Sequence, residues 1–251
     1  MSDRNRGFLE ARVHQRERMD SPDIDPSEFA GALRGLARVN HFTRGAAIVW
    51  PHLRVWAASQ GRPLRVLDVA CGGGDTAIAL ANRFRRMGLE AKIDGCDLSE
   101  SAVEIARANA ARVDADVDFF RLDAVSDSIP REYDVIMSTL FLHHLERRDA
   151  ILFLKRSAEA AGTGLLIQDL VRSRAGWWTA YAGVRLLLCN AVCREDGPRS
   201  VECAFTADEA RELASDAGLA DAKVARRFTY RYVLSWEKRW CSPQPRARCS
   251  L

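Results

Sequence analysis

The chain has 251 residues, with 37 Lys+Arg against 34 Asp+Glu, a net charge of +3 and 47% hydrophobic residues. A chain of this length buries about 70 to 75% of its unfolded surface, so it needs no disulfide or metal ion to fold. Its 28% charged and 8% aromatic residues are typical of a globular protein and exclude a disordered, collagen-like or coiled-coil chain. The small net charge, without a run of five basic residues, also argues against nucleic-acid binding.

Three features predict a cytoplasmic protein without a membrane span or a metal site. The first 20 residues mix Arg with acids and lack the apolar core of a signal peptide. The most apolar stretch, 175–193, carries Arg185 in its middle. The seven cysteines are odd in number and unevenly spaced, as in free thiols, and Cys189 and Cys193 have no CxxC or His partner nearby. Monomer and homodimer remain equally open.

The hydrophobic pattern predicts helices first and then an alternation of strands and helices. Residues 29–39 carry apolar side chains at helical spacing, which indicates a helical N-terminal region. The expected strands are 64–70, 91–97, 117–124, 133–139, 164–170, 221–228 and 229–237, and the expected helices between them are 76–88, 99–113, 148–162 and 205–219. Residues 171–200 form an aromatic, Leu-rich helical insertion.

Short loops between alternating strands and helices specify an α/β, doubly wound sheet, because parallel strands need crossover helices. We therefore predict a seven-stranded Rossmann-like sheet that is mostly parallel and ends in an antiparallel hairpin. The expected domains are an N-terminal helical cap (1–62), a main domain (63–241) with a helical lid at about 171–200, and a flexible tail (242–251).

The glycine cluster that follows the first strand predicts a ligand site. Ligands of such sheets bind at the carboxyl ends of the strands, and Gly72-x-Gly74-x-x-Ala77 is a weak dinucleotide fingerprint. Acids, however, stand at the ends of three strands and after the loop: Asp68, Asp75, Asp97 and Asp123. Two like charges about 4 Å apart repel by about 4 kcal/mol at an effective dielectric near 20. The acids thus favour a cationic ligand such as S-adenosylmethionine over a pyrophosphate.

The residues that follow strengthen this interpretation. The segment DVACGGG (68–74) resembles the D-x-G-x-G-x-G motif of class I S-adenosylmethionine-dependent methyltransferases, with Ala70 in place of the first Gly. GCD (95–97), LDA (122–124) and YDVIMSTLFLHHL (133–145) are similar to the later motifs in order and spacing. The chain is most similar to the small-molecule branch, which includes ubiquinone, menaquinone and polyketide-pathway methyltransferases.

The resemblance implies roles for individual residues toward S-adenosylmethionine, whose product is S-adenosylhomocysteine. The loop of Ala70, Cys71, Gly72 and Gly74 would let the methionine part pass, with a slightly tighter turn at Ala70, and Asp68 would hold the loop or reach the ammonium group through water. The remaining assignments are Asp97 for the ribose, Leu98 for packing on adenine, Asp123 with Ala124 for the adenine amino group, Ser138 and Thr139 beside the methyl donor, and Arg44 for the methionine carboxylate.

Two adjacent histidines follow the fourth expected strand. Methyltransferases of nucleic-acid amines carry an Asn-Pro-Pro-Tyr type motif here, whereas this chain reads Ser-Thr-Leu-Phe (138–141). Histidine is the side chain best suited to accept a proton near neutral pH. We expect His143, rather than His144, to be the base, because neighbouring side chains in a loop point different ways. The alternative is that both only fix the loop.

The acceptor pocket is expected in the helical regions outside the sheet. Trp177, Trp178 and Tyr181 predict an aromatic lining, and Arg185 and Arg199 could meet an anionic or phenolate group. The distribution of net charge agrees with a pocket outside the sheet, next to an acidic cofactor region. The net charge is +3 in 1–62, −5 in 63–170 and +5 in 171–251. The predicted reaction is O-methylation of a phenol or enol in secondary metabolism. C-methylation of a quinol-type ring, a NAD-dependent oxidoreductase and a non-catalytic cofactor-binding protein are the alternatives.

Overall fold

The computed structural model describes residues 9–187 and 189–238, so the predicted tail lies outside the described residues. Its centre is a seven-stranded sheet in the order β3-β2-β1-β4-β5-β7-β6. The strands are β1 (Leu64–Val69), β2 (Ala91–Asp97), β3 (Val117–Arg121), β4 (Val135–Thr139), β5 (Gly164–Leu170), β6 (Lys223–Arg227) and β7 (Arg231–Glu237). The first five are parallel, and β7 runs antiparallel to both β5 and β6. The predicted fold class is confirmed.

Eight helices and two short 3-10 turns complete the described part of the chain. They are η1 (Arg18–Asp20), α1 (Pro26–Phe42), α2 (Gly45–Ser59), α3 (Asp75–Met87), α4 (Glu100–Arg112), η2 (Leu142–His144), α5 (Arg147–Ala160), α6 (Arg174–Leu186), α7 (Ala191–Cys203) and α8 (Ala207–Asp216). None of the helices in this part of the chain has the length and apolar character needed to span a membrane.

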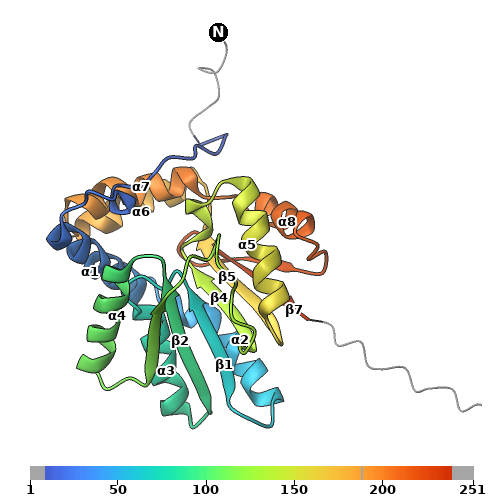
Figure 1. Cartoon of the computed structure of the whole chain (residues 1–251). Helices are drawn as coiled ribbons and strands as arrows, with labels where there is room; N and C mark the ends of the chain where they lie inside the picture. Colours follow the sequence, from blue (N-terminus) through green and yellow to red (C-terminus); the bar gives the residue numbers. More distant parts are fainter. Residues whose placement is uncertain (1–8, 188, 239–251) are drawn as a thin grey trace, which may run out of the picture.

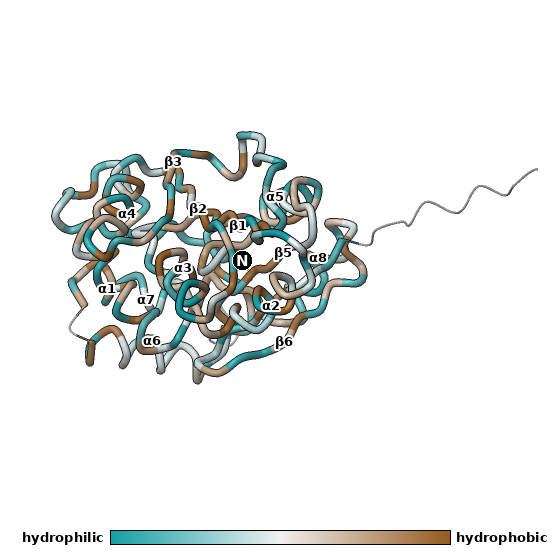
Figure 2. Tube along the Cα trace, turned by 90° about the horizontal axis from the view of Figure 1, so that it is seen from below, coloured by the Kyte–Doolittle hydropathy of each residue, from teal (hydrophilic) through white to brown (hydrophobic). Residues whose placement is uncertain are grey.

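Both faces of the sheet are covered by helices. Successive side chains of a strand point to opposite faces, so Val66 packs with α2, α3 and α4 while Leu67 packs with α5 and α8. The central strands are accordingly apolar on both sides, and Figure 2 shows them largely in brown between helices of alternating colour.

Helix α2 belongs to one of these layers. Its residues Trp50, Leu53 and Trp56 are buried in the same core as the strands, and burying each such side chain contributes about 2 kcal/mol. We predicted that the whole of 1–62 forms a helical cap. In the structure the cap consists of the first part of this range, which includes η1 and α1, because α2 packs in the core.

Helices α1, α6 and α7 lie together at one end of the sheet, at the upper left in Figure 1. Cys193 and Cys189 of the α6–α7 region pack on Gly35 of α1, where an added Cβ would lie 2.6 Å from the Cys193 sulfur. Each thiol approaches a backbone carbonyl of α1. These two cysteines are thus packing residues, and the three helices form a cover over the carboxyl ends of the strands.

Candidate active site

A cavity of about 1010 Å³ lies between this helical cover and the carboxyl ends of the strands. Its walls come from the loops after the parallel strands, from α1, α6 and α7, and from the N-terminal segment that contains η1. Pockets of about 300 to 1,000 Å³ enclose one drug-sized ligand. The cavity lies at the upper end of this range.

The glycine loop turns sharply at the bottom of this cavity. Ala70 (φ 57°) and Gly72 (φ 55°) are both left-handed, and both line the cavity together with Cys71. A side-chain-bearing residue in this conformation costs about 1 kcal/mol, which places a small strain at Ala70. Gly74 lies outside the cavity, and its φ of 75° and the Phe119 ring, 2.6 Å from an added Cβ, explain the glycine.

Asp97 connects this loop to the end of β2. Its Oδ2 accepts a hydrogen bond from the Gly72 N–H at 2.8 Å, and its Oδ1 accepts one from the Ser99 N–H at 3.0 Å. Asp97 lines the cavity, and burial raises the pKa of its carboxyl group. The Asp97 carboxylate thus holds the glycine loop and the turn before α4, and it also lines the cavity.

Two further carboxylates lie around the same loop. Asp75 lines the cavity and accepts a hydrogen bond from the Asn40 amide at 3.1 Å. Asp68 lies beneath the cavity, fully buried, and neither of its oxygens has a hydrogen-bond partner within the described residues. Burial and the nearby Asp75 and Asp97 raise the pKa of Asp68 well above its usual value. The region is strongly unfavourable for a further negative charge.

The other predicted cofactor residues divide into two groups. Leu98, Asp123, Ala124 and Thr139 all line the cavity. Ser138 does not, because its hydroxyl points into the sheet and donates to the Val69 carbonyl at 2.8 Å. Of the two residues predicted beside the methyl donor, only Thr139 therefore faces the cavity.

A buried arginine that we did not predict lies in the cavity wall. Arg44, which we predicted to hold the methionine carboxylate, is exposed at the left-handed turn before α2 and lies outside the cavity. Arg231 of β7 instead lines the cavity and is 2% exposed. Its Nη2 donates to Asn40 at 3.0 Å, while its Nε has no partner within the described part of the chain. Burial lowers the pKa of Arg231 to about 10, although Asp169 and Asp75 favour its charge.

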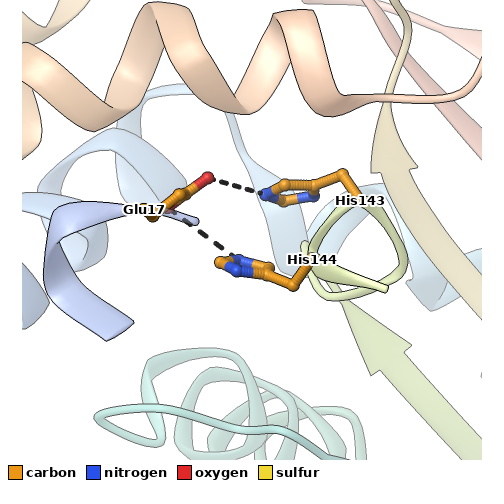
Figure 3. Close-up of side chains that lie close together, drawn as sticks. All are labelled: Glu17, His143 and His144. Atoms are coloured by element: carbon orange, nitrogen blue, oxygen red, sulfur yellow. Dashed lines mark ion pairs between the residues drawn. The ribbon is translucent and has the colours of Figure 1, made fainter. Parts of the chain in front are cut away.

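His143 and His144 lie on the turn η2, and both line the cavity (Figure 3). Their ring centroids are 4.3 Å apart, and both rings face Glu17 of the N-terminal segment. The Nε2 atom of His143 lies 3.4 Å from Glu17 Oε1, and that of His144 lies 4.0 Å from Glu17 Oε2. The prediction that neighbouring histidines diverge is wrong, since both point to one carboxylate.

The opposite ring nitrogens are also held by carboxylates. The Nδ1 atom of His143 lies 2.6 Å from Asp169, and that of His144 lies 2.9 Å from Asp20. Burial by itself would lower the pKa of His143, but Asp169 and Glu17 outweigh it and raise the pKa to about 10. Glu17 has its pKa lowered to about 2 by His144 and His143 against the effect of burial. Both ring nitrogens of His143, the base that we predicted, thus lie next to carboxylates.

The aromatic side chains of α6 lie outside the cavity. Trp177 stacks on Tyr181, Trp178 is 61% exposed, and the Arg185 guanidinium lies over the Tyr181 ring. The cavity is lined instead by the small-residue side of the helix, which includes Gly176, Thr179, Ala180, Gly183 and Val184. Arg199 is likewise absent from the wall and pairs with Glu195 at 3.0 Å. The predicted acceptor residues Trp177, Trp178, Tyr181, Arg185 and Arg199 thus do not line the cavity. The sequence does not show which side of a helix faces inward.

The comparisons agree with this geometry. Residues 66–164, from β1 to the start of β5, match a family model described as a methyltransferase domain. The central part of the chain is thus similar to methyltransferase domains. The resemblance seen in the motifs from residue 68 to residue 145 is thereby confirmed, since all of them lie in the matched segment.

Two curated relatives each match less than half of the chain. The chain is 45% identical over 74 residues to a release factor glutamine methyltransferase of Koribacter versatilis, covering 29% of this chain and 25% of that one. It is 29% identical over 115 residues to a ubiquinone biosynthesis O-methyltransferase of Idiomarina loihiensis, covering 45% of each. The matches thus span a quarter to about half of these relatives.

A solved structure extends the similarity to most of the fold. Magnesium protoporphyrin IX methyltransferase from Synechocystis, with bound S-adenosylhomocysteine, matches with a TM-score of 0.55 and 21% identity. The match covers 80% of this chain and 84% of that chain. At this identity the similarity establishes the fold and not the acceptor.

Glu17 and Arg231 are the site residues that the sequence analysis missed. Glu17 stands in a segment without helical or strand periodicity, and Arg231 is one of many arginines of the chain. Both sit far along the chain from the motifs that they join in space. One signal was present for Arg231, because a charged residue at the start of a buried β-strand is unusual without a partner.

Proposed function

We propose that the protein is an S-adenosylmethionine-dependent methyltransferase that acts on a hydroxyl group, phenol or enol, of a small and largely apolar acceptor. The observation that carries this proposal is the gathering of Asp68, Asp75 and Asp97 around the glycine loop. Pyrophosphate would be repelled there, whereas a sulfonium and an ammonium group would be attracted. The cofactor residues present fit such a ligand.

The cofactor is held, in this proposal, by residues that line the cavity. Asp97 would accept hydrogen bonds from the ribose, Leu98 and Ala124 would pack on adenine, and Asp75 would face the ammonium group. Arg231 would replace Arg44 as partner of the methionine carboxylate, because its buried Nε lacks a hydrogen-bond partner within the described residues. When bound, the cofactor supplies an activated methyl group; the protein aligns the acceptor.

The acceptor occupies the other end of the cavity in this proposal, between η2 and the inner side of α6. Val184 and Leu187 line that end, which favours an apolar molecule. The cluster of Glu17, His143 and His144 is the part of this end suited to remove a hydroxyl proton. The Nε2 atom of His144 lies 4.0 Å from Glu17, whereas that of His143 lies 3.4 Å away, so the His144 nitrogen is less closely paired. We therefore move the base from His143 to His144.

Other predicted properties belong to the same proposal. C-methylation of a quinol-type ring remains the second reaction, because the same cluster would deprotonate the ring hydroxyl and activate the neighbouring carbon. A role in secondary metabolism and a cytoplasmic location are proposed with it; the five described cysteines are all free thiols, as a reducing compartment would keep them. The acceptor, rather than a nucleic acid, is the proposed partner.

Ligand-dependent stability tests this proposal directly. A ligand that binds only the native state stabilises it by about 2.7 kcal/mol at a concentration of 100 times its Kd. We expect S-adenosylhomocysteine to raise the melting temperature by several degrees and NAD to leave it unchanged. Stabilisation by NAD alone would overturn the methyltransferase proposal in favour of an oxidoreductase.

The two sides of α6 give a second test. Replacing Ala180, which lines the cavity, with tryptophan should fill the acceptor end and raise the KM for the acceptor at least tenfold, while the Kd for S-adenosylhomocysteine stays the same. Trp178→Ala, on the outer side, is the matched control and should change neither value. Equal effects of the two variants would show that the acceptor does not lie against α6.

A further inference from the structure

The cluster of Glu17, His143 and His144 has the composition of a metal site. A glutamate and two histidines offer three ligand atoms, all within 4.8 Å of one another. Zinc bound to nitrogen and oxygen at about 2.0 to 2.2 Å in tetrahedral geometry holds its ligand atoms about 3.4 Å apart. The Nε2 atom of His143 lies 3.4 Å from Glu17 Oε1, and the Nε2 atom of His144 lies 4.0 Å from Glu17 Oε2, so both imidazoles are near this ligand spacing from the carboxylate.

Each of the three side chains is also oriented by a partner on its far side. The Nδ1 of His143 faces Asp169, and the Nδ1 of His144 faces Asp20. Glu17 accepts a hydrogen bond from the Ser200 hydroxyl. Histidines that bind metals almost always use their second nitrogen in this way, with a carboxylate or carbonyl that fixes the tautomer, and metal-binding carboxylates are hydrogen-bonded in turn. The arrangement leaves both Nε2 atoms directed at the Glu17 carboxylate, as Figure 3 shows.

The charge around this point favours a cation. Glu17 lies near both imidazoles, Asp169 contacts His143 and Asp20 contacts His144. Glu17 and Asp169 are 5% and 1% exposed. Positive side chains near the cluster are directed elsewhere: Arg12 donates to the His143 and Leu145 carbonyls, and Arg199 pairs with Glu195 and Asp196.

We propose that Glu17, His143 and His144 bind one divalent transition-metal ion of the zinc type at the acceptor end of the cavity. Neutral imidazoles and a carboxylate suit Zn²⁺ and its neighbours better than Mg²⁺ or Ca²⁺, which prefer oxygen ligands alone. Three protein ligands leave a fourth position open, as in catalytic zinc sites. All three ligands line the cavity, so that position is reached from it.

The role of the ion rests on the proposed function. A hydroxyl bound to a Lewis acid loses its proton to solvent, so the acceptor oxygen would bind as an anion and the histidines would serve as ligands instead of bases. The oxygen then forms the new O–C bond as the S–C bond of the sulfonium breaks, with that electron pair staying on sulfur. Because Glu17 lies in the N-terminal segment and the histidines lie on η2, the ion would also fasten that segment over the cavity.

Titration of chelator-treated, full-length protein with Zn²⁺, and with Co²⁺ as a spectroscopic probe, tests the site without an acceptor. We expect one ion per chain, with the visible absorption of tetrahedral Co²⁺. Glu17→Gln and His144→Gln should each weaken binding at least 100-fold, and Asp20→Asn, an exposed residue that orients His144, about 10- to 100-fold. His52→Gln, on α2 and outside the cavity, is the matched control and should bind as the unchanged protein does.

The outcomes separate this inference from the proposed function. Absence of stoichiometric binding, or unchanged affinity in Glu17→Gln and Asp20→Asn, would overturn the metal site. Stabilisation of the metal-free protein by S-adenosylhomocysteine, measured in parallel, reports the cofactor site alone. Binding of S-adenosylhomocysteine without binding of an ion would support the methyltransferase proposal and contradict the metal site. Binding of an ion without binding of S-adenosylhomocysteine would support the metal site alone.

Discussion

Replacing Asp97 with alanine is expected to raise the Kd for S-adenosylhomocysteine at least 100-fold, which corresponds to about 2.7 kcal/mol. The carboxylate holds the Gly72 and Ser99 amides at 2.8 and 3.0 Å, and it lines the cavity where the ribose is proposed to bind. Its loss would remove the hydrogen bonds to the ligand and leave two backbone N–H groups without their acceptor. Hydrogen bonds to a charged group contribute about 1.5 to 3 kcal/mol each.

Isothermal titration of the two proteins measures this effect. Asp118→Ala is the matched control, because Asp118 is an exposed carboxylate on the neighbouring strand β3 and pairs with Lys92 at 3.0 Å. We expect the control to bind the ligand normally. A Kd for Asp97→Ala within threefold of the unchanged protein would contradict the proposed position of the ribose.

Replacing His144 with glutamine is expected to lower kcat by about 10² to 10⁴-fold, the usual contribution of a positioned proton acceptor. The loss is expected whether His144 takes the proton itself or holds an ion that lowers the pKa of the hydroxyl. His143→Gln should have a similar effect, because both rings converge on Glu17. Neither histidine contacts the glycine loop through a hydrogen bond in the described part of the chain, so the affinity for S-adenosylhomocysteine should stay unchanged.

Transfer of a radiolabelled methyl group to a panel of phenols and pyrones gives the acceptor, and the best acceptor then gives kcat for each variant. His52→Gln serves again as the control, because its side chain lies on α2, away from the cavity. If His143→Gln and His144→Gln both turned over at the normal rate, the η2 turn would have only a structural role. Loss of cofactor affinity in these variants would instead place the cluster nearer the methionine part of the cofactor.

The sequence by itself determined the sheet and the position of the glycine loop. Apolar runs such as 64–70 and 164–170 have one structural solution, because a strand that is apolar on both faces must be buried between helices. The loop could be predicted for a similar reason. A glycine cluster directly after the first strand, with acids at the following strand ends, places its residues at one edge of a parallel sheet, and Ala70, Gly72, Asp97 and Asp123 do lie together there.

Only the tertiary structure decided which side chains face the cavity from outside the sheet. The sequence favoured the aromatic residues of α6, but the helix presents Gly176, Ala180 and Gly183 to the cavity and Trp178 to solvent. The direction of a helix side depends on the packing of α6 against α1 and α7, which is set by contacts remote in sequence. The same holds for Arg231 and for Glu17, which meets His143 and His144 only because the N-terminal segment crosses the carboxyl ends of the strands. Local pattern fixes secondary structure and loops, whereas a site assembled from distant segments depends on how those segments pack.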